Sequence, residues 1–113
     1  MKQALNDTKE HTADNTGMIL TVAFDYGGRT ELMGAVRAAR SAGQRVTPAS
    51  IESHLHDPSL PPIDVMIRTS GEIRVSNFML WQSAGAAIHF TDTPWPDFDA
   101  VELDAAIALV GRT

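Results

Sequence analysis

Residues 63–78 read IDVMIRTSGEIRVSNF, and this stretch decides the fold class. An apolar run leads up to Arg68, and a polar Thr-Ser-Gly turn follows it. The run predicts a buried strand over 64–69, and Ser76 predicts the N-cap of a helix that extends to about Ala84. A strand, a polar loop and a helix in this order are typical of α/β proteins.

The polar part of this stretch indicates an anion site. Arg68 and Arg74 each carry a planar fork of donors that suits phosphate oxygens, and the Ser76 hydroxyl adds a neutral donor. The start of the predicted helix would contribute backbone N–H groups and the positive end of its dipole. The alternative is that both arginines are ordinary surface charges beside a capped helix.

The rest of the chain alternates between helical and strand-like segments. We predict a polar helix over 2–16, a buried strand over 18–24, helices that begin at Thr30 and Thr47-Pro48, a strand over 87–91 and a last helix capped by Asp97. Two helices show apolar residues at helical spacing, which predicts their buried faces: Leu32, Val36 and Ala39 in one, and Phe98, Val101, Ala105 and Leu109 in the other. The expected architecture is a partial parallel sheet of about three strands with flanking helices and right-handed crossovers.

Length and composition narrow the class of protein. The chain has 113 residues, of which 43% are hydrophobic and 20% charged, so we expect one soluble globular domain at most, smaller than a typical complete α/β enzyme. A net charge of −5 disfavours nucleic-acid binding, and no apolar run is long enough to cross a membrane. The polar N-terminus is unlike a signal peptide and predicts a cytoplasmic location, and the absence of cysteine excludes thiolate chemistry.

Several segments together resemble one family in order and spacing. They are residues 63–72, 76–82, 90–92 and 95–98, together with the upstream run NTGMILTVAFDYGGR at 15–29. In this order they resemble the cis-prenyltransferases, the family that includes undecaprenyl diphosphate synthases. The resemblance implies that residues 1–113 are the C-terminal half of a cis-prenyltransferase domain.

This resemblance implies a reaction and a site. The family condenses isopentenyl diphosphate with an allylic diphosphate to make a cis-polyprenyl diphosphate. Arg68, Arg74 and Ser76 match the positions that hold the diphosphate of isopentenyl diphosphate. Secondary candidates are Arg29, Glu72 and Asn77. Arg29 could instead pair with Glu31 or Asp25. Glu72 could either order Arg74 or approach a magnesium ion.

The sequence also departs from the family pattern. The family's Asp-Gly-Asn-Gly-Arg-Trp loop is absent, Ala87 stands where a glutamate coordinates Mg²⁺, and an arginine-rich tail is missing after Thr113. The family cofactor is Mg²⁺, but we assign no metal ligand and no catalytic residue in this chain. His11, His54, His56 and His89 show no metal-binding spacing.

These departures leave several functions open. We do not expect the chain to be active alone, and we expect a homodimer or a complex with a complete homologue. The alternatives are a noncatalytic partner subunit, an inactive truncated gene product, and a general anion-binding module. Phe78, Trp81, Phe90 and Trp95 suit either the dimer interface that the family builds here or packing within the subunit.

Overall fold

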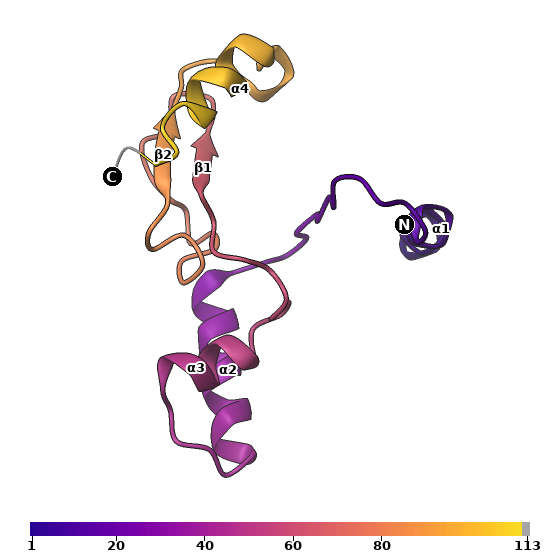
Figure 1. Cartoon of the computed structure of the whole chain (residues 1–113), viewed down its shortest axis with the longest axis vertical. Coiled ribbons are helices and arrows are strands. Elements are labelled where there is room, and N and C mark those ends of the chain that lie inside the picture. The colour runs from indigo at the N-terminus through magenta and orange to yellow at the C-terminus, as the bar shows by residue number, and fades with distance from the viewer. Residues whose placement is uncertain (112–113) are drawn as a thin grey trace.

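A computed structural model describes residues 1–111 of the chain. The prediction about the arginine-rich tail lies outside these described residues. The elements, in order, are α1 (Lys2–Thr12), α2 (Gly28–Ser41), α3 (Pro48–Ser53), β1 (Val65–Arg68), β2 (Ala87–Phe90), a short 3-10 helix (Trp95–Asp97) and α4 (Ala100–Ile107). Figure 1 shows α2 and α3 below the two strands and α4 above them. The α/β class is confirmed, and no described helix is long and apolar enough to cross a membrane.

The sheet consists of two parallel strands. Val65 of β1 pairs with Ala87 of β2, and the register continues to Arg68 opposite Phe90. The predicted strands over 64–69 and 87–91 are therefore both confirmed, one or two residues shorter than expected. The carboxyl ends of both strands lie at the same edge, where the polar residues of the predicted site begin.

The helices α2 and α3 pack against each other. The predicted helix start is confirmed for α3 and is wrong for α2. The Thr47 side chain accepts a hydrogen bond from the backbone N–H of Ser50, whose hydroxyl in turn accepts from the Thr47 N–H, and Pro48 occupies the first turn. In α2 the predicted cap at Thr30 is wrong, because the helix already begins at Gly28 with Gly27 as its N-cap.

The predicted buried faces of two helices need correction. In α2 the fully buried residues are Gly28, Glu31, Ala35 and Ala39, whereas Leu32 and Val36 are only half-buried. The last helix is capped by Asp99, whose carboxylate accepts from the Glu102 N–H, because Trp95–Asp97 forms a separate turn instead. Its buried residue is Ala106, and Val101 and Ala105 are exposed.

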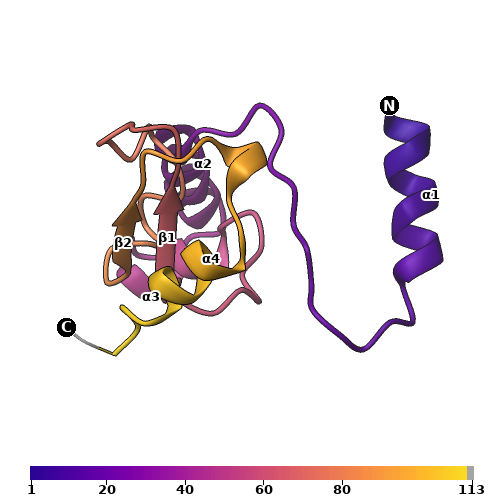
Figure 2. The same cartoon turned by 90° about the horizontal axis from the view of Figure 1, so that it is seen from above.

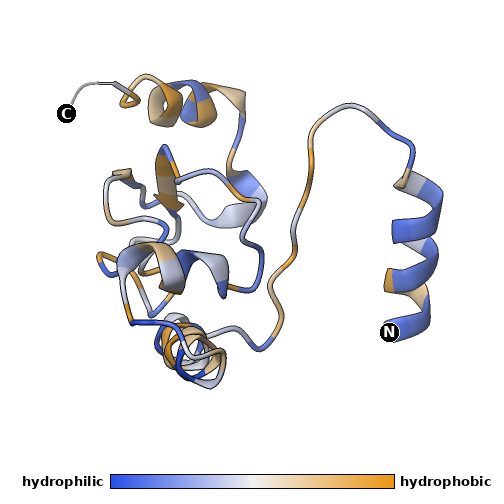
Figure 3. Cartoon of the chain, turned by 60° about the horizontal axis from the view of Figure 1, so that its bottom comes forward, coloured by the Kyte–Doolittle hydropathy of each residue, from blue (hydrophilic) through white to orange (hydrophobic). Residues whose placement is uncertain are grey.

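The predicted strand over 18–24 is not formed. These residues are extended and exposed, and they connect α1 to the rest of the chain as an arm. Figure 2 shows α1 standing apart at the end of this arm, and Figure 3 shows apolar residues along it. The sheet has two strands instead of about three, since within the described residues no strand pairs with the arm.

The helix predicted over 76–84 is also absent. The segment is a series of turns, and Ser76, Asn77 and Met79 all have positive φ, at 53°, 60° and 49°. Left-handed residues cannot continue a right-handed helix. The helix dipole and helix N–H groups that the sequence predicted for the anion site are therefore not available there.

Gly28 is required where α2 meets the 76–80 loop. Its N–H donates to the Asn77 carbonyl at 2.7 Å, and a Cβ there would lie 2.9 Å from Leu80 Cγ and 3.0 Å from the Asn77 oxygen. We expect Gly28→Ala to lower the free energy of unfolding by about 1–3 kcal/mol, because the backbone oxygen cannot move away freely.

The matched control is Gly34→Ala in the same helix, where a Cβ meets nothing within 4 Å. That substitution should stabilise the chain by up to about 1 kcal/mol through helix propensity. Urea unfolding followed by circular dichroism measures both variants. Equal effects of the two substitutions would show that the close approach at Gly28 is unimportant.

Candidate functional site

The loop after β1 is held by the segment that follows β2. The N–H of Ser70 donates to the Thr93 carbonyl, and the N–H of Gly71 donates to the Thr91 carbonyl, both at 3.0 Å. Ser70 and Gly71 have φ of 67° and 73°, so the chain turns sharply here. A Cβ on Gly71 would lie 3.2 Å from Asp92 Oδ1. The loop after β1 and the segment after β2 therefore lie side by side at the carboxyl edge of the sheet.

The two candidate arginines differ in their surroundings. Arg68 is the last residue of β1 and is half-buried. Arg74 lies in the loop, with 68% of its side chain exposed, and its Nε is 2.9 Å from Glu72 Oε2. Glu72 therefore orders Arg74, one of the two roles that the sequence left open. Because this contact runs through Nε, the terminal Nη groups keep donors for an anion.

The Tyr-Gly-Gly-Arg turn is joined to the same loop through Asn77. The Asn77 side-chain Oδ1 accepts from the backbone N–H of Arg29 at 3.0 Å, and the Asn77 carbonyl accepts from the N–H of Gly28. Ser76 and Asn77 are exposed, as is Arg29. Asn77 thus fixes the position of the turn relative to the loop that carries the candidate site residues Arg74 and Ser76.

Below this junction lies a buried carboxylate that the sequence interpretation treated only as a partner for Arg29. Glu31 is 4% exposed. Its Oε1 accepts from the Tyr26 hydroxyl and from Gln82 Nε2 at 3.0 Å, and its Oε2 accepts from the backbone N–H of His56 at 2.9 Å. The carboxylate therefore joins three segments of the chain, and its partners do not include Arg29, which the sequence offered as one alternative.

The electrostatics of this cluster follow from its burial. Burial by itself would raise the pKa of the Glu31 carboxyl, but the hydrogen bonds from Tyr26, Gln82 and the His56 backbone outweigh it and lower this pKa. For Tyr26, burial and the hydrogen bond to Glu31 both oppose ionisation and raise the pKa of its phenol to about 12. The Tyr26 ring also packs edge-on against Phe78 and His56.

This pKa shift predicts a change of stability in alkaline solution. Tyr26 has a higher pKa in the folded chain, so its contribution to stability is complete below pH 10 and is lost as the pH rises from 10 to about 12. Tyr26 is the only tyrosine in the chain, so tyrosinate absorbance reports on it alone. We expect its ionisation to occur at higher pH in buffer than in urea, and coincident titration curves would contradict the buried hydrogen bond.

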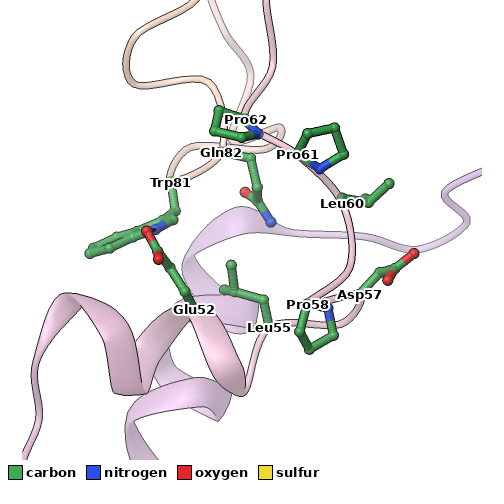
Figure 4. A pocket seen from close by; sticks show the side chains of 9 residues that line it. All are labelled: Glu52, Leu55, Asp57, Pro58, Leu60, Pro61, Pro62, Trp81 and Gln82. Atoms are coloured by element: carbon green, nitrogen blue, oxygen red, sulfur yellow. Dashed lines mark hydrogen bonds between the residues drawn. The ribbon is translucent and has the colours of Figure 1, made fainter.

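A hollow lies beside the residues that surround Glu31 (Figure 4). It has a volume of ≈ 160 Å³ and is lined mainly by Leu55, three prolines of the 58–62 loop and Trp81. The Trp81 Nε1–H donates to Glu52 Oε1 at 3.3 Å across its rim. Trp81 therefore packs within the subunit. Phe78 meets the Tyr26 ring edge-on but is 43% exposed, Phe90 is 40% exposed, and Trp95 stacks on Phe98 and is 68% exposed.

The described residues do not fit a complete magnesium site. Among residues 1–111 no three His, Asp or Glu side chains lie close enough together to hold a metal ion. Ala87 opens β2 with a methyl group that cannot coordinate a cation.

Comparisons with known proteins agree with this fold. Residues 1–110 match the family described as putative undecaprenyl diphosphate synthase. An isoprenyl transferase of Neisseria gonorrhoeae is 44% identical over 107 residues, which are 94% of this chain and 43% of that protein. A ditrans,polycis-undecaprenyl-diphosphate synthase of Vibrio vulnificus is 40% identical over 95% of this chain and 45% of its own length.

Two solved structures are similar as well. A probable undecaprenyl diphosphate synthase from Campylobacter jejuni superposes with a TM-score of 0.82 at 25% identity, over 95% of this chain and 50% of that one. Lavandulyl diphosphate synthase from Lavandula x intermedia, solved with dimethylallyl diphosphate, superposes with a TM-score of 0.78 at 33% identity. The superposition covers 95% of this chain and 49% of that one. The chain spans about half the length of the relatives it matches. It belongs to the undecaprenyl diphosphate synthase family of isoprenyl transferases.

Proposed function

We propose that this chain supplies the isopentenyl diphosphate site of an isoprenyl transferase, with Arg68, Arg74 and Ser76 binding the diphosphate. The observation that carries the proposal is the loop after β1, which is anchored at the carboxyl edge of the sheet in a chain that matches the family over residues 1–110. Arg74 has free terminal donors and Ser76 an exposed hydroxyl in this loop.

The secondary residues have supporting roles in this proposal. Glu72 holds the Arg74 guanidinium at 2.9 Å, and Asn77 accepts from the Arg29 N–H at 3.0 Å, so both restrict the loop before an anion arrives. Arg29 is exposed beside Asn77 and adds positive charge. A loop that is already ordered loses less conformational entropy on binding.

The complete reaction needs the whole domain. Condensation of isopentenyl diphosphate with an allylic diphosphate requires a second substrate site, and the relatives that carry the whole activity are about twice as long as the matched part. We propose that this chain contributes to catalysis only together with the remaining half, in one polypeptide or in a complex. Magnesium would be held elsewhere, since the described residues lack a ligand cluster.

Isothermal titration calorimetry tests the proposed site directly. The chain, in buffer with a chelator, is titrated with isopentenyl diphosphate, inorganic pyrophosphate and inorganic phosphate. We expect isopentenyl diphosphate to bind with a dissociation constant on the order of micromolar and phosphate to bind much more weakly. Equal affinity for isopentenyl diphosphate and pyrophosphate would favour the general anion-binding alternative, and no heat with any probe would show that the assignment is wrong.

A further inference from the structure

The loop after β1 is held at its two ends only. At its start, the backbone N–H groups of Ser70 and Gly71 donate to carbonyls of the segment after β2. At its end, Asn77 accepts from the N–H of Gly28. Within the described residues, no hydrogen bond joins residues 72–76 to any other segment. The position of the candidate diphosphate ligands in this loop therefore depends on the two ends.

The start of the loop is connected to α4 through one residue. The Thr93 carbonyl accepts from the Ser70 N–H at 3.0 Å, and the Thr93 hydroxyl donates to Glu102 Oε1. The Thr93 N–H is occupied as well, since it donates to Thr91 Oγ1 at 3.2 Å. Figure 1 shows α4, which carries Glu102, beyond the carboxyl ends of both strands. The carboxylate of α4 thus fixes the residue that holds the loop.

Stability alone does not account for a carboxylate at this place. Glu102 Oε2 is buried and has no hydrogen-bond partner among the described residues. A buried acceptor without a donor costs stability, and apolar side chains of similar size would avoid that cost. What the carboxylate does provide is a fixed orientation for Thr93, because its other oxygen accepts from the Thr93 hydroxyl.

We propose that Glu102 and Thr93 are positioning residues for the diphosphate site. Glu102 orients Thr93, and Thr93 holds the start of the loop that carries Arg74. A loop that is already held in one conformation loses less conformational entropy when the anion binds. The inference rests on the proposed function, because this positioning contributes only if the loop binds the diphosphate.

The informative variant is the double substitution Thr93→Val/Glu102→Leu. Thr93→Val alone would leave both carboxylate oxygens unpaired, whereas the double variant removes both polar partners and should keep a urea midpoint close to that of the unaltered chain. We expect its affinity for isopentenyl diphosphate in titration calorimetry to fall by about fivefold or more. Hydrogen exchange of the Ser70 and Gly71 amides should become about tenfold faster or more, since their acceptors are held less firmly.

Two controls separate positioning from stability. Glu102→Gln keeps an acceptor for the Thr93 hydroxyl and should retain the affinity within about twofold. Thr47→Val removes the hydroxyl that caps α3, so it should lower the urea midpoint and also leave the affinity within about twofold.

The outcomes distinguish this inference from the proposed function. Equal affinity of the double variant and the unaltered chain, unchanged exchange at residues 70 and 71, or an equal loss of affinity in Thr47→Val would overturn the positioning role and leave the diphosphate site in place. No binding by the unaltered chain would overturn the proposed function, and this inference with it.

Discussion

Replacing Glu31 with alanine should lower the free energy of unfolding by about 3–5 kcal/mol, the largest effect of any single substitution in this chain. The variant would leave three donors without their acceptor: the Tyr26 hydroxyl, the Gln82 amide and the backbone N–H of His56. Each donor is attached to a different segment, so the loss also loosens the junction between them. Urea unfolding monitored by tryptophan fluorescence measures the change.

Glu31→Gln is the informative comparison. Tyr26 and Gln82 both donate to Glu31 Oε1, and the His56 N–H donates to Oε2, so a glutamine at position 31 has an acceptor for only one of these two sides. We expect this variant to lose about half as much stability as the alanine variant. A difference of less than about 1 kcal/mol between Glu31→Ala and the unaltered chain would show that the carboxylate does not hold the segments together.

The pH dependence of stability, compared between the unaltered chain and Glu31→Gln, separates the effect of the carboxylate charge from that of the side-chain shape. The pKa of Glu31 is lowered in the folded chain, so its contribution is complete above pH 4.5 and is lost as the pH falls through the folded value. The Glu31→Gln variant has no carboxyl to protonate and should lack this part of the acid dependence. Identical acid profiles would mean that the carboxylate charge is unimportant.

Substitution of Arg74 should produce the largest change in ligand binding. Arg74→Ala is expected to weaken isopentenyl diphosphate binding by about tenfold to a hundredfold, because charge-assisted bonds to the diphosphate are lost. Arg74→Lys should recover only part of that loss, since an ammonium cannot present two parallel donors. Titration calorimetry compares both with Arg37→Ala, which removes an exposed arginine from the middle of α2.

Stability should respond differently from binding. The Arg74–Glu72 pair is exposed on both sides, and such pairs contribute little, so Arg74→Ala should change the free energy of unfolding by less than about 0.5–1 kcal/mol. A large loss of stability would indicate a structural role for Arg74. Unchanged binding in Arg74→Ala would remove this residue from the proposed site.

Local signals were sufficient for part of the fold. Thr47 and Pro48 define a helix start that depends only on neighbouring residues, and the strands 65–68 and 87–90 are short apolar runs that pair with each other. The arm 18–24 has an equally clear strand pattern, but a strand also needs a partner, and the described residues contain none for it. A sequence pattern indicates that a segment will be buried without indicating what buries it.

The errors at the candidate site have a different cause. Ser76 resembles an N-cap, but the backbone at Ser76, Asn77 and Met79 is left-handed, and Asn77 accepts hydrogen bonds from Gly28 and Arg29, which are distant in sequence. The sequence does not indicate that Glu31 is an organising residue, because a carboxylate is rarely buried. Its spacing with Ala35 and Ala39 was the available signal, since the three residues lie one turn apart on the same side of α2.

The sparse interior of this chain determines how it should respond to temperature. Its buried apolar residues are Ala35, Ala39, Leu55, Met66 and Ala106, and no large side chain among the described residues is fully buried. Unfolding therefore exposes little new apolar surface, and the heat-capacity increment should fall below the roughly 1.2–1.5 kcal/mol/K usual for 100 residues. Its stability curve should therefore be shallow and broad.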